Sequence, residues 1–311
     1  MTNGEIERAA GFLAAHAILF LAAGIVLALI ALASVVGAIH LLRRYRDVIR
    51  RTFTSALGYA RQFELFERSL ARSRAFLPGP YLVVHLALGL AVTAAVAVFV
   101  VIAEDVVGHG AVVTFDLAFA QALQDSATPS LTQVFGIVTW LGSGYALAVV
   151  TALVAVYLAR QHDRLAAMGW IAAQAGGWLL NYALKEAFER TRPSFADPLL
   201  AATSWSFPSG HAMGTFILLG VGSYLFLRNV RSWSAAAVVI TLALSWCVVM
   251  AFSRLYLGVH FASDVVAGLI AGVAWVAVCA SAFEVIRSRR RTISAPEVRL
   301  RQQRKLSGID T

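Results

Sequence analysis

The feature that most constrains this chain is a series of long apolar runs without Asp, Glu, Lys or Arg, the first of which covers residues 11–42. A helix of that length would measure about 48 Å, whereas the hydrocarbon core of a bilayer is about 30 Å thick. Inside hydrocarbon every backbone polar group needs an internal partner, so runs of this kind form helices. Hydrophobic residues make up 59% of the chain and the mean hydropathy is +0.73, which excludes an ordinary soluble protein. We therefore expect an all-α fold, a polytopic bundle of transmembrane helices.

Seven runs are long enough to cross a bilayer, and the first must tilt or project beyond the hydrocarbon. They divide the chain into an amino-terminal transmembrane helix (1–42), an arginine-rich linker (43–80), a six-helix membrane domain (81–285) and a basic tail (286–311). We expect the tail to be disordered. The expected spans are 11–42, 81–103, 137–159, 165–184, 211–228, 233–251 and 264–285.

Arginine placement predicts the orientation of these spans. Residues 43–78 contain nine arginines, and the connectors and tail on the same side contain Arg160, Arg164, Arg228, Arg231 and Arg287. Cytoplasmic segments of membrane proteins are enriched in Lys and Arg. We therefore expect a multi-pass protein of the cell (inner) membrane with a cytoplasmic carboxyl terminus. The amino terminus, the acidic segment 104–125 and the loops 185–210 and 252–263 would face the periplasm or the exterior.

Charge and cysteine content exclude several classes of function. The formal net charge is +9, but no basic domain or recognition motif accompanies it, so we expect no nucleic-acid partner. Apolar residues recur near helical spacing among the linker arginines, which fits either an amphipathic helix on the inner leaflet or a solvated helical hairpin. Cys247 and Cys279 lie in apolar runs and indicate neither a disulfide framework nor a metal site. Acidic residues near the amino terminus and the length of the first run argue against a cleaved signal peptide.

The first loop that carries chemistry begins at the end of the fourth expected span. Lys185 is one of only two lysines in the chain, and Arg192 follows seven residues later, on the same side if the segment is helical. Lysine offers a compact charge and arginine a planar fork, and both suit phosphate oxygens. The alternative is an ordinary helix end whose charged side chains reach for water.

The stretch Pro208-Ser209-Gly210-His211 lies at the entrance of the next span. A helix amino terminus presents free N–H groups and a partial positive charge, which favour a bound anion. Gly210 permits close backbone approach, Ser209 adds a hydroxyl and His211 lies beside the site. The alternative is a serine cap with an incidental histidine.

The third element comprises Arg254, His260 and Asp264. His260 and Asp264 are four residues apart, so a helix would place them within hydrogen-bond reach. A carboxylate on one ring nitrogen fixes the tautomer and leaves the other nitrogen as a nucleophile or base. The alternative is a satisfied histidine at a membrane interface, but an ionisable pair that enters a span is costly and favours a function. The three elements fall on one predicted side of the membrane, which favours a single site.

In order and spacing these elements resemble the signature of the type 2 phosphatidic acid phosphatase (PAP2) superfamily. Its K-x6-RP part corresponds to Lys185 and Arg192-Pro193, its PSGH part to residues 208–211, and its SR-x5-H-x3-D part to Ser253-Arg254, His260 and Asp264. The resemblance covers roughly residues 81–285, and it leaves out the first span, the linker and the tail.

The resemblance implies a core of six membrane helices and a mechanism that uses no metal and no cofactor. In it His260 attacks phosphorus and forms a phosphohistidine, Asp264 orients His260, and His211 protonates the leaving oxygen. The phosphoryl oxygens would be held by Lys185, Arg192, Ser209, Gly210 and Arg254. Three cations and a helix amino terminus can stabilise the charge that phosphoryl transfer develops.

A site at the outer interface can take a phosphate headgroup while the lipid tail stays in the bilayer. We therefore expect a phosphatase of lipid phosphates or pyrophosphates, with undecaprenyl pyrophosphate, phosphatidylglycerol phosphate and phosphatidic acid as candidate substrates. A lipid phosphotransferase would share every motif residue. An anion transporter or channel is the alternative from another class, but it would distribute ionisable groups through the depth of the membrane. Neither the residues nor the resemblance indicates an oligomeric state.

Overall fold

The computed structural model describes residues 2–19, 22, 79–195, 204–230 and 232–306, and in these ranges it contains helices and no strand. This confirms the predicted all-α class. The helices are α1 (Asn3–Ala15), α5 (Gly79–Val107), α6 (Ala111–Asp125), α7 (Pro129–Leu141), α8 (Gly144–Arg160), α9 (Arg164–Phe188), α10 (Gly210–Leu227), α11 (Trp233–Tyr256) and α12 (Ala262–Leu306).

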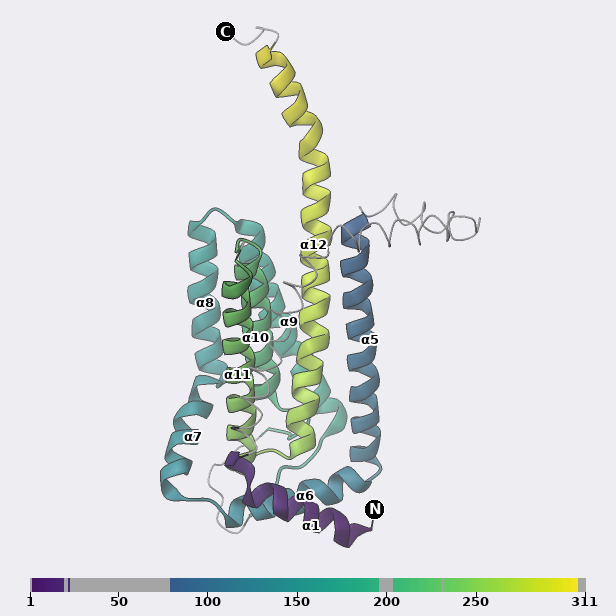
Figure 1. Ribbon diagram of the computed structural model, residues 1–311, viewed down its shortest axis with the longest axis vertical. Coiled ribbons are helices and arrows are strands. Elements are labelled where there is room, and N and C mark those ends of the chain that lie inside the picture. Colours follow the sequence, from purple (N-terminus) through teal and green to yellow (C-terminus); the bar gives the residue numbers. More distant parts are fainter. Residues whose placement is uncertain (1, 20–21, 23–78, 196–203, 231, 307–311) are drawn as a thin grey trace, which may run out of the picture.

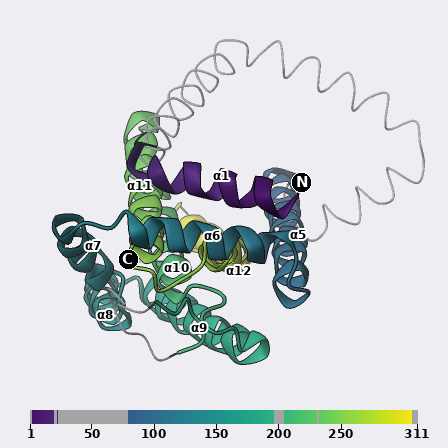
Figure 2. The ribbon, with the colours of Figure 1, turned by 90° about the horizontal axis from the view of Figure 1, so that it is seen from below.

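Helices α5 and α8 to α12 run along the length of the molecule, whereas α1 and α6 lie across one end of the bundle (Figures 1 and 2). Helix α10 packs against α9, α11 and α12, and α12 also packs along α5. A core of Trp170, Met213, Ile217 and Val221 fills the space between these helices. Small residues allow the close approach that membrane helices need, since a Cβ at Gly220 would meet Val276 of α12 at 2.8 Å.

Each of the six spans expected between residues 81 and 285 coincides with an observed helix, with two corrections. Four described helices, α5, α10, α11 and α12, are long and apolar enough to cross a membrane on their own. The expected span 137–159 is instead the pair α7 and α8, bent by 43°. The bend occurs because α7 ends at Leu141, Gly142 follows as its C-cap, and Ser143 caps α8 by accepting a hydrogen bond from the N–H of Ala146.

The second correction concerns the expected span 165–184. Helix α9 covers this range and extends to Phe188, and it is long enough to cross a membrane, but it is not among the described helices that are apolar enough to do so. Polar residues such as Gln174 and Asn181 lower its hydropathy. Helix α9 packs against α8 and α10 within the bundle.

The amino-terminal helix also differs from the prediction. Helix α1 begins at Asn3, where Thr2 and Glu5 form a capping box, and ends at Ala15. Ile6, Ala10 and Ala14 are buried, and α1 packs along α6 across the end of the bundle (Figure 2). The first residues of the expected span 11–42 therefore do not enter the membrane lengthwise. The remainder of that span from residue 23, and the linker as far as residue 78, lie outside the described residues.

Two further segments outside the expected spans are helical. The acidic segment 104–125 contains α6, which Asp105 helps to begin by accepting a hydrogen bond from the N–H of Val112 at 2.8 Å. The tail that we expected to be disordered continues α12 as far as Leu306 (Figure 1). Arg, Gln, Leu and Lys, which favour helices, dominate the tail, and one proline does not interrupt it.

The described arginines of the short connectors lie at the end of the bundle opposite to α1 and α6. Helix α8 ends at Arg160, α9 begins at Arg164, and Arg228 follows α10 and pairs with Asp163. The other end receives the carboxyl terminus of α9, the amino termini of α10 and α12 and the carboxyl terminus of α11 (Figure 1). The up-and-down topology therefore brings all three sequence elements to one end.

Candidate active site

His260 lies in the short connection between α11 and α12 and is 2% exposed. Its Nδ1 is 3.4 Å from Oδ2 of Asp264, and its Nε2 is 3.2 Å from Nη1 of Arg192. A guanidinium nitrogen can only donate, so Nε2 is the accepting nitrogen and the proton of the neutral ring is on Nδ1. The ring therefore presents a lone pair toward the cations.

The environment of His260 keeps the imidazole neutral. Burial lowers the pKa of His260 to about 3, and the positive charges of Arg192 and Arg254 act in the same direction. Asp264 opposes this shift through its hydrogen bond and its charge. A neutral imidazole is the form that can act as a nucleophile.

Asp264 is fully buried in the first turn of α12, and four groups hold its carboxylate. Oδ2 accepts hydrogen bonds from the hydroxyl of Ser206 and from the N–H of Phe261, and it faces His260. Oδ1 accepts a hydrogen bond from Arg190 at 2.6 Å. This carboxylate is therefore fixed on both oxygens.

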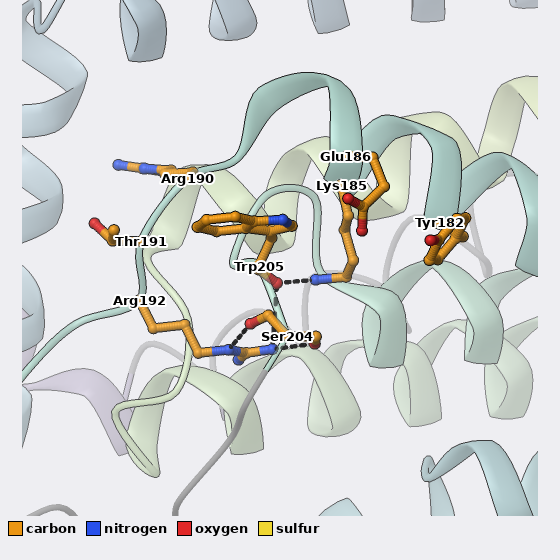
Figure 3. Close-up of a pocket in the computed structure, with 8 residues that line it drawn as sticks. All are labelled: Tyr182, Lys185, Glu186, Arg190, Thr191, Arg192, Ser204 and Trp205. Carbon is orange, nitrogen blue, oxygen red and sulfur yellow. Dashed lines mark hydrogen bonds between the residues drawn. The ribbon is translucent and has the colours of Figure 1, made fainter.

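Lys185 and Arg192 lie on either side of the segment around Trp205 (Figure 3). Lys185 is 9% exposed and donates to the carbonyl oxygen of Trp205. Arg192 donates to the carbonyl oxygens of Ser204 and Val259, both at 2.6 Å, besides its contact with His260. The two predicted cations thus reach the same backbone segment, and Arg192 also reaches the imidazole.

Helix α10 begins beside this cluster. Ser209 is fully buried, its N–H donates to the carbonyl oxygen of Asp264 at 2.9 Å, and its Oγ has no hydrogen-bond partner among the described residues. A Cβ at Gly210 would come within 2.9 Å of Oδ1 of Asn181, so glycine permits the close approach of α9. The free hydroxyl and the helix amino terminus together offer donors to an anion.

Arg254, near the end of α11, is 3% exposed. Its Nη1 donates to the hydroxyl of Thr139, while its Nε has no hydrogen-bond partner among the described residues. Such an unpaired buried donor is costly unless a ligand satisfies it. Arg254 is therefore a second group with a free donor in the cluster.

His211 follows Gly210 at the start of α10 and lies against Gly142, where an added Cβ would be 3.2 Å from its ring. It interacts electrostatically with His260 and with the side chains of Arg254, Arg192 and Lys185. The structure thus brings together all the residues that the sequence singled out.

Four further residues of the site were not predicted: Asp116, Thr139, Arg190 and Ser206. Arg190 lies two residues before Arg192, and this proximity was a usable signal. Ser206 lies in the loop that leads into α10, and Thr139 is an uncharged residue of α7. Asp116 belongs to α6, far from the motifs in sequence, and nothing in the sequence connects it to them.

A cavity of about 520 Å³ opens beside the cluster. Figure 3 shows its lining, which combines Lys185, Arg190 and Arg192 with Tyr182, Glu186, Thr191, Ser204 and Trp205. Among the described residues, no group of three or more His, Cys, Asp or Glu side chains is arranged to hold a metal ion.

The fold and the site define an α-helical membrane protein with a buried histidine–aspartate pair beside a cluster of cations. Residues 138–287 match the family model of the PAP2 superfamily. This match confirms the resemblance to the PAP2 superfamily that the sequence motifs predicted.

Curated relatives support this assignment. The chain is 42% identical over 96 residues to phosphatidylglycerophosphatase B of Bacillus subtilis (strain 168), which covers 30% of this chain and 47% of that protein. It is 37% identical over 76 residues to phosphatidylglycerophosphatase B of Haemophilus influenzae, which covers 24% of this chain and 30% of that protein. The chain therefore matches less than half the length of these curated relatives.

A solved structure is similar over a longer range. The transmembrane PAP2 type phosphatidylglycerolphosphate phosphatase from Bacillus subtilis superposes with a TM-score of 0.57 at 28% identity. The match covers 64% of this chain and 96% of that one.

Proposed function

We propose that the protein is a phosphatase of membrane lipid phosphates that acts through a phosphohistidine on His260. The observation that carries the proposal is the placement of this ring, whose Nε2 lies 3.2 Å from Arg192 while Asp264 lies 3.4 Å from the opposite nitrogen. A neutral imidazole fixed in this way beside cations is suited to attack phosphorus.

In the first step Nε2 of His260 attacks phosphorus, an N–P bond forms and the P–O bond to the lipid breaks. Lys185, Arg192 and Arg254 neutralise the oxygens of the phosphoryl group, and the free hydroxyl of Ser209 donates to one of them. His211 gives its proton to the leaving alkoxide. The dianionic headgroup brings the negative charge that allows His211 to carry a proton beside these cations.

In the second step the neutral His211 takes a proton from water, the water oxygen attacks phosphorus and the N–P bond breaks. The products are inorganic phosphate and the dephosphorylated lipid, and His260 returns to its neutral form. The two steps need no oxidant and no metal, because His260 supplies the attacking electron pair and His211 gives and takes back the proton.

The proposed substrates are lipids whose phosphate lies at the outer surface of the membrane. The site is at the end of the bundle opposite to the arginines of the connectors, and we propose that this end faces the periplasm or the exterior. Phosphatidylglycerol phosphate is the first candidate, since the curated relatives are phosphatidylglycerophosphatases. Undecaprenyl pyrophosphate and phosphatidic acid are the other two.

The test is phosphate release by the purified full chain in detergent micelles that contain each of the three lipids, with a metal chelator present. We expect turnover by the wild type, none by His260→Ala and a strong reduction by Asp264→Asn. The control is His162→Asn, an exposed histidine with a positive φ of 58° that asparagine tolerates. A requirement for added magnesium, or turnover by His260→Ala, would contradict the mechanism.

A second measurement separates a phosphatase from the alternatives. Substrate with a labelled phosphoryl group, quenched during turnover, should leave acid-labile label on the wild type and none on His260→Ala. Phosphate transfer that depends on a second lipid would indicate a phosphotransferase. A chain that releases no phosphate and carries no label would be consistent with a transporter instead.

A further inference from the structure

Arg190 joins two carboxylates from different parts of the chain. Its Nη1 donates to Asp264 at 2.6 Å and to the hydroxyl of Ser263 at 2.7 Å, and its Nη2 donates to Asp116 at 2.8 Å. Its guanidinium lies 4.4 Å from the centre of the Phe261 ring. In Figure 3 the guanidinium groups of Arg190 and Arg192 point in opposite directions. Arg190 therefore binds the carboxylates of Asp264 and Asp116, while Arg192 contacts the imidazole of His260.

Asp116 is fully buried on α6 and outside the part of the chain that the family model matches. It accepts hydrogen bonds from the N–H of Ser263 at 3.0 Å, from the hydroxyl of Ser263 and from Arg190. Burial raises the pKa of Asp116, and the hydrogen bonds from Ser263 and Arg190 oppose this shift. Ser263 and Arg190 thus both favour the ionised form of Asp116.

Ser263 immediately precedes Asp264, so Asp116 holds the first turn of α12 through the backbone as well as through Arg190. A carboxylate that is bound on one side only can rotate about its last torsion. Here Arg190 occupies Oδ1 of Asp264, which leaves Oδ2 for Ser206, the N–H of Phe261 and His260. The contacts of Arg190 with Asp264 and Asp116 therefore fix the orientation of the Asp264 carboxylate relative to the imidazole.

We propose that Arg190 and Asp116 form a positioning unit that fixes the carboxylate of Asp264, and through it sets the orientation and the proton affinity of His260. The inference rests on the proposed function, because His260 must be the nucleophile for its orientation to affect turnover. Neither residue of the unit touches the reacting atoms.

The charges around His260 and Asp264 predict how changes at Arg190 and Asp116 alter the pH dependence of turnover. His260 faces Asp264, Arg192, Arg254 and His211, and Asp264 is also within the electrostatic reach of Lys185. Arg190 neutralises part of the charge of Asp264 that would otherwise raise the pKa of His260. Removing the charge of Arg190 should therefore raise that pKa, whereas removing the charge of Asp116 should not.

Three variants separate position from charge. Arg190→Lys keeps the charge but lacks the planar fork whose two nitrogens reach the two carboxylates, and we expect kcat to fall about 10²-fold with KM within twofold of the wild type. Arg190→Gln should show the same loss and should also move the acid limb of the pH profile of kcat/KM upward by about half a unit or more. Asp116→Asn should lower kcat and leave the acid limb unchanged or move it to lower pH.

The control is Asp125→Asn, a change of another carboxylate on α6, which is exposed and accepts a hydrogen bond from Gln121 at 2.8 Å. We expect it to leave kcat, KM and the pH profile unchanged. The double variant Asp116→Asn with Arg190→Gln should be no slower than Arg190→Gln alone. Unchanged kinetics in the Arg190 variants, or losses that multiply in the double variant, would overturn the proposal.

Thermal unfolding in detergent supplies a readout that does not depend on turnover. If the two residues act as one unit, the double variant should melt no lower than the less stable single variant. Additive losses in Tm would overturn the unit whether or not the wild type releases phosphate. Absence of turnover in the wild type, with non-additive losses in Tm, would instead refute the proposed function and leave the bridge intact.

Discussion

The close contact between α12 and the start of α10 offers a test of the geometry of the site. Gly268 lies one turn after Asp264 on α12, and a Cβ at this position would be 2.6 Å from the carbonyl oxygen of Ser209 and 3.3 Å from its nitrogen. A carbon and a carbonyl oxygen in ordinary contact are separated by about 3.3 Å. The substitution Gly268→Ala must therefore move α12 and Ser209 apart by roughly 0.7 Å.

The added Cβ is fixed to the backbone of α12 and its neighbours are backbone atoms of Ser209, so no side chain can rotate away to relieve the contact. The hydrogen bond from the N–H of Ser209 to the carbonyl oxygen of Asp264 resists the same movement. A displacement of about 1 Å in a site that requires near-attack geometry can cost about 10²-fold in rate. We expect Gly268→Ala to lower kcat by 30- to 100-fold, an order-of-magnitude estimate, and to cost about 1–3 kcal/mol of stability through overpacking.

The assay is phosphate release from phosphatidylglycerol phosphate in detergent micelles, with Tm measured on the same preparations. The matched control is Gly89→Ala on α5, where an added Cβ has no other atom within 4 Å. That change should be neutral or slightly stabilising, since alanine favours a helix by about 0.8–1 kcal/mol over glycine. If Gly268→Ala retains turnover within twofold and an unchanged Tm, the contact does not hold the site as the structure indicates.

Three other predictions follow from single residues. Thr139→Val removes the hydroxyl that accepts from Arg254 and should raise KM about tenfold with a smaller change in kcat, and an unchanged KM would show that this bond does not position the cation. The pKa of His260 is about 3, below its usual 6.5, so the unfolded chain binds this proton first and stability should fall as pH decreases from about 6.5 toward 3. Unfolding measured between pH 7 and 5 should show a loss of about 1 kcal/mol per pH unit from this residue, and a His260→Ala variant with the same slope would refute the assignment. In a background without native cysteines, Ser126→Cys and Gln161→Cys should react with an impermeant thiol reagent from opposite sides of the membrane, and labelling of both from one side would contradict the topology.

Much of the fold could be predicted from the sequence because its spans are long and nearly free of charge. Five of the six expected core spans each coincide with one observed helix, and the sixth is the bent pair α7 and α8. The bend at Gly142 was missed because a periodic apolar run gives little information about a break of two residues. Helix α1 was missed because its apolar face is satisfied by α6, and this partner is far away in sequence.

Some residues of the candidate site could be predicted from the sequence and others could not. Lys185, Arg192, His211 and His260 stand in motifs whose order and spacing are distinctive, so the sequence identified them without a structure. Asp116 carries no such signal. It sits in an acidic segment that resembles any polar loop, and only the packing of α6 under α12 gives it a buried role.

The sequence by itself determined the class of protein, the apolar core spans and the residues that we propose to carry the chemistry, because these depend on composition and on local spacing along the chain. The tertiary structure decided which nitrogen of His260 accepts, which oxygen of Asp264 faces it and how Arg190 holds that carboxylate in place. These properties depend on distances between segments that are remote in sequence. A hydrogen bond is lost within a few tenths of an ångström, and spacing along the chain does not set positions in space to that accuracy.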